Sequence, residues 1–152
     1  MSDPQPNKEV WYRIVDLASG QQVCRFEVGK SGKSKPVFSP DGSVLAIGSY
    51  DKEIVLWNTK TGAVHNRFKV SSSVWTLAYT PDGTGLFASL EGTLVLLDAA
   101  TGATKRTFGG PSLHAAALAV SPSGEVLAAV TRSLKKPGTD FVSLWEVATG
   151  GQ

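Results

Sequence analysis

The sequence predicts an all-β protein in which a four-stranded antiparallel sheet is repeated along the chain. Two observations carry this prediction. A turn tetrapeptide recurs at a constant spacing of 41 residues, and short apolar segments bounded by turn residues fill the intervals between its copies. No segment of useful length shows the periodicity of an amphipathic helix.

The composition agrees with strands that are covered on both faces. Hydrophobic residues make up 41% of the chain and charged residues 18%, against roughly 25% charged in an average soluble protein. The formal net charge of +2 is too small to predict nucleic acid as a partner, because nucleic-acid binders carry a distinct basic stripe. The net charge therefore does not predict a nucleic-acid partner, and we expect none.

The first marker of the repeat is the turn tetrapeptide. It reads SPDG at 39–42, TPDG at 80–83 and SPSG at 121–124. A small hydroxyl residue at the first position, Pro at the second and Gly at the fourth are the preferences of a type I turn. Each copy is therefore interpreted as the connection between two strands of a hairpin.

A second marker follows each turn and defines the unit. It reads LWNTKTG at 56–62, LLDAATG at 96–102 and LWEVATG at 144–150, and a fourth copy, IVDLASG, stands at 14–20. One complete unit holds four predicted strands, named a to d, at 74–79, 85–90, 93–98 and 103–108. A repeated four-stranded sheet that is apolar on both faces finds cover by stacking against its neighbours around an axis.

These residues resemble the WD-repeat family of β-propellers, and the resemblance covers 10–150. The SPDG turns, the LW pair of strand c and the closing TG are the matching features. No copy carries the complete Trp-Asp pair: the two positions read VD at 15–16, WN at 57–58, LD at 97–98 and WE at 145–146. The Gly-His pair that precedes strand a is also absent, so the hydrogen-bond network of His, Ser, Asp and Trp that the family implies is not expected here.

The predicted strands do not fill complete blades at either end of the chain. We expect 1–9 to be a disordered N-terminus and 10–150 to form the propeller segment, with partial blades at 10–28 and 114–150 and whole blades at 35–70 and 74–108. This amounts to about three to three and a half blades, and propellers have about four to eight. The ring is therefore predicted to be incomplete. The chain is expected either to pair with a copy of itself by exchange of strand d or to be part of a longer propeller.

Two basic loops are the candidate contact sites for a partner. The d-to-a loop reads GKSGKS at 29–34, and the b-to-c loop of the last unit, RSLKKPGTD at 132–140, is six to seven residues longer than its counterparts. Loops of these two kinds emerge on the same rim of a propeller, and insertions in one repeat often map to the binding side. Contact with an acidic protein or peptide is therefore predicted for Lys30, Lys33, Lys35, Arg132, Lys135 and Lys136. The alternative is that these lysines only keep the rim soluble.

Other residues that could act in catalysis or bind a ligand have a structural explanation. The GKSGKS segment has two residues between its glycines where a phosphate-binding loop needs four, and no helix follows it. His65 and His114 have no second ligand at metal-binding spacing. The carboxylates predicted to cap turns or strand ends are Asp51, Asp82, Asp98 and Asp140. We expect neither a metal nor another cofactor.

The large and reactive side chains are assigned to the interior with one exception. The tryptophans expected to fill the core between blades are Trp57, Trp75 and Trp145, which lie in predicted strands. Trp11 begins the predicted strand c of the partial blade at 10–28 and is expected to be exposed. Cys24, the only cysteine, lies in a predicted strand and is expected to be a buried, inert thiol.

The function predicted from these observations is a non-catalytic scaffold that binds a protein or peptide, as the WD-repeat resemblance implies. The alternatives are a piece of a larger propeller without independent function and, less favoured, a subunit of a propeller enzyme. No segment approaches the roughly 18 apolar residues of a membrane helix, and the N-terminus lacks a signal-peptide core. We therefore expect a cytoplasmic protein that does not bind membranes.

Overall fold

Thirteen strands in four antiparallel sheets make up the computed structural model, which describes residues 11–27, 34–109, 115–132 and 140–151. The first sheet is a hairpin of β1 (Trp11–Val15) and β2 (Gln22–Glu27). The second contains β3 (Val37–Phe38), β4 (Val44–Gly48), β5 (Glu53–Asn58) and β6 (Val64–Lys69). The third contains β7 (Val74–Tyr79), β8 (Gly85–Leu90), β9 (Thr93–Asp98) and β10 (Thr104–Phe108). The fourth contains β11 (Ala115–Val120), β12 (Val126–Arg132) and β13 (Asp140–Glu146).

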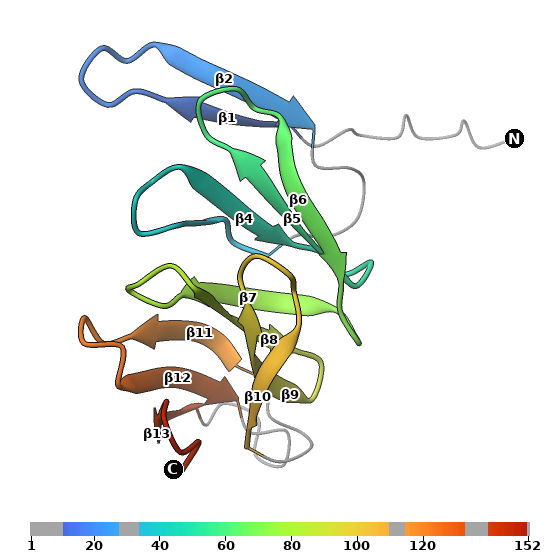
Figure 1. Ribbon diagram of the computed structural model, residues 1–152, viewed down its shortest axis with the longest axis vertical. Helices are drawn as coiled ribbons and strands as arrows, with labels where there is room; N and C mark the ends of the chain where they lie inside the picture. The colour runs from blue at the N-terminus through green and yellow to red at the C-terminus, as the bar shows by residue number, and fades with distance from the viewer. Residues whose placement is uncertain (1–10, 28–33, 110–114, 133–139, 152) are drawn as a thin grey trace, which may run out of the picture.

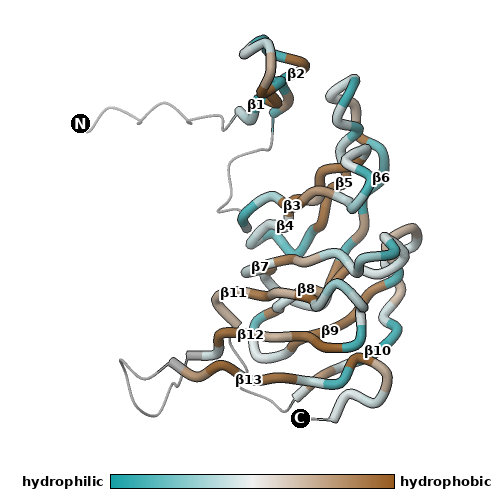
Figure 2. Tube along the Cα trace, turned by 90° about the vertical axis from the view of Figure 1, so that its left-hand side faces the viewer, coloured by the Kyte–Doolittle hydropathy of each residue, from teal (hydrophilic) through white to brown (hydrophobic). Residues whose placement is uncertain are grey.

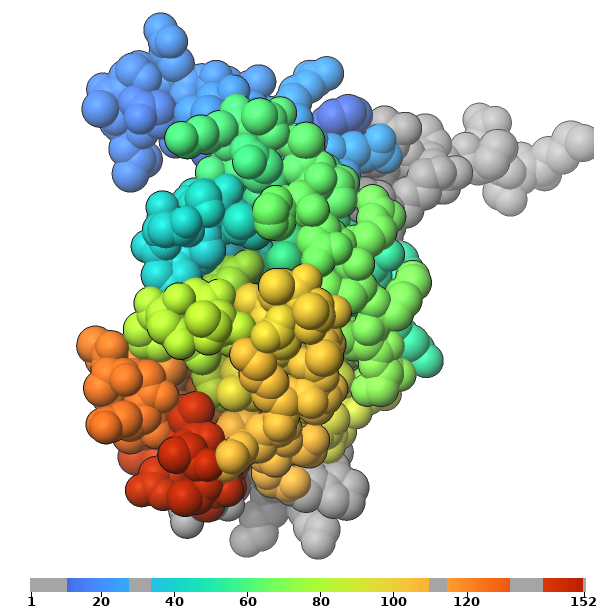
Figure 3. Space-filling model, viewed as in Figure 1, coloured from blue at the N-terminus to red at the C-terminus, as the bar shows by residue number. Residues whose placement is uncertain are grey.

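The four sheets follow one another in chain order along the long axis of the molecule (Figure 1). In the space-filling view the colours succeed each other from blue to red in the same order, so each sheet touches the next (Figure 3). The inner strands of consecutive sheets are neighbours: β7 contacts β3 and β4 on one side and β11 on the other. The stack confirms the all-β class, the four-stranded antiparallel blade and the incomplete ring.

The domain boundaries predicted at 9/10 and 150 stay predictions, because residues 1–10 and 152 lie outside the described residues. Among the described residues, none forms a helix with the length and apolar character that crossing a membrane requires. The hydrophobic residues are instead concentrated in short strands such as β8, β9 and β12, and the turns between strands are mainly hydrophilic (Figure 2).

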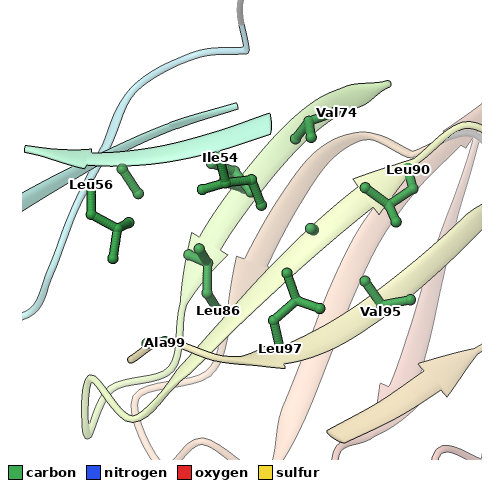
Figure 4. Close-up of a cluster of buried hydrophobic side chains, with 11 residues drawn as sticks. Ile54, Leu56, Val74, Leu86, Leu90, Val95, Leu97 and Ala99 are labelled. Atoms are coloured by element: carbon green, nitrogen blue, oxygen red, sulfur yellow. The ribbon is translucent and has the colours of Figure 1, made fainter. Parts of the chain in front are cut away.

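Each interface between consecutive sheets is filled by its own cluster of buried side chains. The largest lies between sheets β3–β6 and β7–β10, where Ile54 and Leu56 face Leu86 and Leu97 (Figure 4). A second cluster around Phe87, Phe108 and Trp145 joins sheets β7–β10 and β11–β13. The third joins the hairpin β1–β2 to sheet β3–β6. Every residue of β8 is buried, as expected for a strand that has a sheet on each side.

The SPDG turns have the geometry that their sequence predicts. In each turn the amide of the fourth residue donates to the carbonyl of the first, over 2.8 to 2.9 Å. The glycines at 42, 83 and 124 have φ values of 71°, 73° and 78°, a region that residues with a side chain rarely adopt. Gly83 also packs on the ring of Pro40, and Gly124 packs on Pro81, so the second and third turns each stack on the turn of the preceding sheet.

Strand d of each sheet is tied to the turn between strands c and d of the next sheet. The Cys24 thiol donates to the Thr59 carbonyl over 3.3 Å, and the Asn66 amide donates to the Ala100 carbonyl over 2.6 Å. The Arg106 guanidinium makes the equivalent contact with the Ala148 carbonyl. We refer to these three hydrogen bonds as the intersheet ties. The three donors lie two residues before Phe26, Phe68 and Phe108 in β2, β6 and β10.

The tryptophans follow the sequence prediction with one correction. Trp57 and Trp145 are buried and Trp11 is exposed, as predicted. Trp75 was predicted to fill the core, but 46% of its surface is exposed. The pairing of β7 with β8 shifts register between Val74 and Thr76, so Trp75 occupies a β-bulge. A bulge changes the direction of a side chain relative to the strand alternation, and Trp75 is therefore turned out of the interface.

Replacement of Gly102 by Ala is expected to destabilise the protein by about 2 to 5 kcal/mol, the sum of left-handed backbone strain and overpacking. Gly102 has a φ of 74°, and a Cβ at this position would overlap the ring of Phe68 in the preceding sheet. Gly42→Ala is the matched control, because Gly42 has a φ of 71° but no atom near its Cβ position. It is expected to cost about 1 to 2 kcal/mol. Urea unfolding at neutral pH measures both, and equal losses would show that contact with Phe68 contributes nothing.

Candidate functional site

The predicted basic rim is only partly within the described residues. Lys35 is exposed and lies just before β3. The backbone of Arg132 ends β12, where it pairs with Asp140, but its side chain is not among those described. The four remaining predicted contacts, Lys30, Lys33, Lys135 and Lys136, lie outside the described residues. The structure thus leaves the six residues as a prediction.

Lys35 and Arg132 lie toward the same rim of the stack but in sheets that are not adjacent. Lys35 precedes strand a of sheet β3–β6, and Arg132 ends strand b of sheet β11–β13. The start of strand a and the end of strand b share one end of a sheet, because these strands are antiparallel. Sheet β7–β10 stands between the two residues. A partner that touches both would therefore have to extend across the width of one blade.

The opposite rim carries two grooves that sequence reasoning did not identify. One has a volume of about 640 Å³ and lies between the turns of sheets β3–β6 and β7–β10. Its principal walls are Pro40, Asp41, His65, Tyr79, Pro81 and Asp82. The other has a volume of about 540 Å³ and lies between the equivalent turns of sheets β7–β10 and β11–β13. The same elements form both grooves, because the repeat places an SPDG turn and a turn between strands c and d at each interface.

The aspartates of the first groove are held in the ionised form by their own turns. Asp41 accepts hydrogen bonds from the Ser39 hydroxyl at 2.5 Å and the Ser43 hydroxyl at 2.7 Å. These two bonds, in that order, lower the pKa of the Asp41 carboxyl from 3.8 to about 2. Asp82 accepts equivalent bonds from Thr80 and Thr84, which also lower its pKa. Both carboxylates are therefore negative at neutral pH, and the prediction that Asp82 caps a turn is confirmed.

Tyr79 supplies a neutral donor at the wall of the same groove. Burial, followed by the negative charge of Asp41, raises the pKa of the Tyr79 phenol to about 12. The phenol keeps its proton at neutral pH and is available as a hydrogen-bond donor. His65 lies on β6 and is exposed at the edge of this groove. His114 lies outside the described residues.

The position of the Asp in the WD pair has a capping role in this chain. The Asp98 carboxylate accepts the amides of Ala100 and Thr101 and lies 2.9 Å from Lys105 Nζ, and the lysine is the largest cause of its lowered pKa. Asn58 accepts the corresponding amides of the preceding sheet. Asp98 thus caps a turn as predicted. The side chain of Asp140 is not among those described.

The buried polar groups are consistent with a repeat that lacks the family's hydrogen-bond network of His, Ser, Asp and Trp. Trp57 Nε1 is the one buried side-chain nitrogen or oxygen among the described residues that lacks a hydrogen-bond partner, and the indole is held by stacking on Phe26 at 4.5 Å. Cys24 is buried as predicted and serves as an intersheet tie. In the part of the chain that the structure describes, no three His, Cys, Asp or Glu side chains come together in a way that could hold a metal ion.

Comparisons with known proteins agree with this architecture. Residues 7–135 match the family model described as "Outer membrane protein assembly factor BamB", a propeller-type repeat. The chain is 30% identical over 118 residues to periodic tryptophan protein 2 homolog of Dictyostelium discoideum, a match that covers 74% of this chain and 12% of that protein. It is 38% identical over 66 residues to eukaryotic translation initiation factor 3 subunit I of Aspergillus oryzae, covering 40% of this chain and 20% of that protein.

Among solved structures, the dihydro-heme d1 dehydrogenase NirN has a similar fold. The TM-score is 0.69 at 20% identity, and the match covers 93% of this chain and 34% of NirN. At this level of identity the likeness concerns the fold alone. The chain therefore spans about a third of this neighbour and a fifth or less of the two relatives described above.

The lowered pKa values of Asp41 and Asp82 predict a defined acid dependence of stability. A carboxyl whose pKa is lower in the folded state stabilises the fold above its unfolded pKa of 3.8, and this contribution is lost as the pH falls through the folded value, about 2 for Asp41. We expect the urea midpoint to fall from pH 4 to pH 2 and to fall less in D41N/D82N. Lys60→Gln removes a charge from the same rim and should leave the fall unchanged. An identical fall in D41N/D82N would contradict the assignment.

Proposed function

Because the chain belongs to the family of propeller-type repeats whose model matches residues 7–135, with repeats of the WD type, we propose that it is a non-catalytic scaffold for protein or peptide partners. The observation that carries this proposal is the repeated pair of rims. One rim is built from stacked turns, with an open groove between sheets β3–β6 and β7–β10 and another between sheets β7–β10 and β11–β13. The other rim carries Lys35 and the end of β12 at Arg132. Stacked sheets keep these turns at fixed positions, so a partner meets a preorganised surface.

The basic rim is the surface that we propose for an acidic partner. It comprises Lys35, which is exposed, together with Lys30, Lys33, Arg132, Lys135 and Lys136. The first groove, on the other rim, has the opposite character, because Asp41 and Asp82 are ionised there and none of the described residues that line it is a lysine or an arginine. Opposite charges at Lys35 and at the first groove would orient an incoming charged partner before contact. An acidic partner is therefore directed to the rim of Lys35.

The two alternative functions rest on weaker observations. An enzyme subunit is suggested only by the fold shared with NirN, and a shared fold does not imply a shared activity. A piece of a larger propeller without independent function agrees with the small share of each relative that the chain covers. We favour the scaffold because the relatives are WD-repeat proteins, one of them a subunit of a translation initiation factor by its name. A location in the cytoplasm belongs to the same proposal and rests on the sequence.

Peptide binding tests which rim receives a charged partner. Fluorescence anisotropy is measured with a Glu-rich peptide and with a peptide that carries Lys at the same positions. We expect the Glu-rich peptide to bind more tightly and its binding to weaken as salt is added. Lys35→Glu should weaken binding about threefold, the size expected for one exposed charge pair. The triple variant K30E/K33E/K35E should weaken it more.

Lys60→Glu is the matched control, since Lys60 is an exposed lysine in a turn between strands c and d on the groove rim. Equal weakening by Lys35→Glu and Lys60→Glu would show that only net charge matters. Tighter binding of the Lys-rich peptide would assign the binding surface to the groove rim instead. Binding of neither peptide would count against recognition of charged segments by this chain.

A further inference from the structure

Sheet β11–β13 exposes a face that has the composition of a buried interface. The exposed fractions of Val142 and Leu144 in β13 are 69% and 56%. These residues occupy the repeat positions of Ile54 and Leu56 in β5, which are 0% and 3% exposed because sheet β7–β10 covers them. Strands β12 and β13 are mainly hydrophobic and lie at the end of the stack (Figure 2). This face therefore fits another sheet rather than water.

The same sheet also has a free hydrogen-bonding edge. One edge of β13 pairs with β12 along seven residue pairs, from Arg132 with Asp140 to Val126 with Glu146. In sheets β3–β6 and β7–β10 the other edge of strand c is occupied by β6 and β10. Among residues 11–27, 34–109, 115–132 and 140–151, no strand occupies this edge of β13. A strand d would complete both the edge and the repeat.

Strand β2 has the sequence and the contacts of a strand d. Its Cys24-Arg25-Phe26 segment corresponds to Asn66-Arg67-Phe68 in β6. Phe26 stacks on Trp57 at 4.5 Å, and Cys24 donates to the Thr59 carbonyl. Both contacts join β2 to sheet β3–β6, and neither involves β1. The position of β2 on sheet β3–β6 is therefore compatible with a different partner at its other side.

The pairing of β1 with β2 contains one unfavourable cross-strand pair, although Tyr12 stacks on Phe26. Arg13 lies directly opposite Arg25 in the hairpin, and both residues are exposed. Like charges that face each other across an antiparallel pair destabilise it. Strand β1 has five residues, against seven in β13, and a two-stranded hairpin is marginally stable without further strands. Replacement of β1 by β13 would remove the arginine pair and make β2 part of a four-stranded sheet.

We propose that β2 of one copy of this chain pairs with β13 of a second copy as the fourth strand of sheet β11–β13. The pairing of β5 with β6 sets the register, because Leu56 faces Asn66, and Ile54 faces Phe68. By the same register Leu144 of one copy faces Cys24 of the other, and Val142 faces Phe26. Arg25 then faces the small Ser143 instead of Arg13.

The exchange also covers the exposed face. Sheet β3–β6 accompanies β2, and its Leu45, Ile47 and Trp57, which contact Tyr12 and Ile14 in the single chain, then contact Val142 and Leu144. When each copy donates its β2 to the other, every copy supplies two complete sheets and most of a third. The product is a ring of about six blades, within the range of about four to eight that closes. The surface formed by β13 therefore fits a second copy of the chain.

A disulfide between Cys24 and an introduced cysteine at Leu144 tests this register. Residues directly opposite in an antiparallel pair have Cα atoms about 4.5 to 5.5 Å apart, which a disulfide can span. L144C is refolded from urea at micromolar concentration and oxidised mildly. We expect a covalent dimer on a non-reducing gel and a mass about twice 16.0 kDa by light scattering. Leu144 is an exposed position, so the substitution itself is expected to be tolerated.

Three controls separate the proposal from other associations. C24S/L144C should give no crosslink, which excludes a disulfide between two introduced cysteines. S143C should crosslink more slowly, because Ser143 faces Arg25 and its side chain is on the other face of the sheet. V23C/C24S/L144C should not crosslink, since Val23 points away from the core of sheet β3–β6. A crosslink in that variant but not in L144C would show that intact hairpins stack on the free face. A monomer of 16.0 kDa at micromolar concentration would also overturn the exchange.

Discussion

The structure depends on one constraint: a sheet that is apolar on both faces must be covered on both faces. Strand β8 shows this most completely, since all of its residues are buried. Leu86 faces the preceding sheet and Phe87 faces the following one. Neighbouring side chains of one strand thus belong to different cores, and no sheet of this kind is stable alone. Stacking in chain order satisfies the constraint because each sheet uses one face for each neighbour.

Stacking by hydrophobic contact alone would leave the sheets free to slide, since the hydrophobic effect is not directional. The intersheet ties supply the direction. A thiol, an amide and a guanidinium act at the same repeat position, in Cys24, Asn66 and Arg106, and each donates to a carbonyl of the next turn between strands c and d. The position requires a donor of suitable reach rather than one residue type, which explains why no motif marks it in the sequence.

The glycines of the same turns allow the close approach between sheets that the intersheet ties need. Gly62 lies against Cys24, Gly102 against Phe68 and Gly150 against Arg106. Gly20, the equivalent residue of the hairpin β1–β2, has no atom near its Cβ position, since no sheet precedes it in the described residues. The repeated TG thus serves both a left-handed backbone conformation and a close approach between sheets.

The sequence was sufficient to predict the strands, the SPDG turns and the capping roles of Asp82 and Asp98, because these features depend on residues close together in the chain. It failed where the position of one residue depended on register. Trp75 follows the alternation of a core position, but the bulge between Val74 and Thr76 turns it outward. The Gly-Gly or Pro signals that often accompany an irregular strand are absent from 74–79, and the sequence therefore gave no warning.

The grooves were missed for a different reason. Each aspartate of the groove rim is fully explained by its own turn, so neither Asp41 nor Asp82 attracts attention alone. A groove arises because two such turns come from residues 41 positions apart and stack through Pro40 and Gly83. The constant spacing of the tetrapeptide was the available signal, since turns at the same repeat position must lie on the same rim. The basic loops, in contrast, were visible as charge clusters, but most of their residues lie outside the described ranges.

The two ends of the stack differ in a way that bears on assembly. Stacked repeat proteins usually protect a terminal repeat with a polar outer face. The hairpin β1–β2 has charge on its outer face, because Arg13 and Arg25 are exposed and the Arg25 guanidinium lies 4.8 Å from the Trp11 ring, although Trp11, Val15 and Val23 are exposed as well. Sheet β11–β13 has no equivalent protection at Val142 and Leu144, which keep the apolar character of their buried counterparts. Association is therefore expected to be directed by the face of β13 that carries Val142 and Leu144, while the rims remain free for other partners.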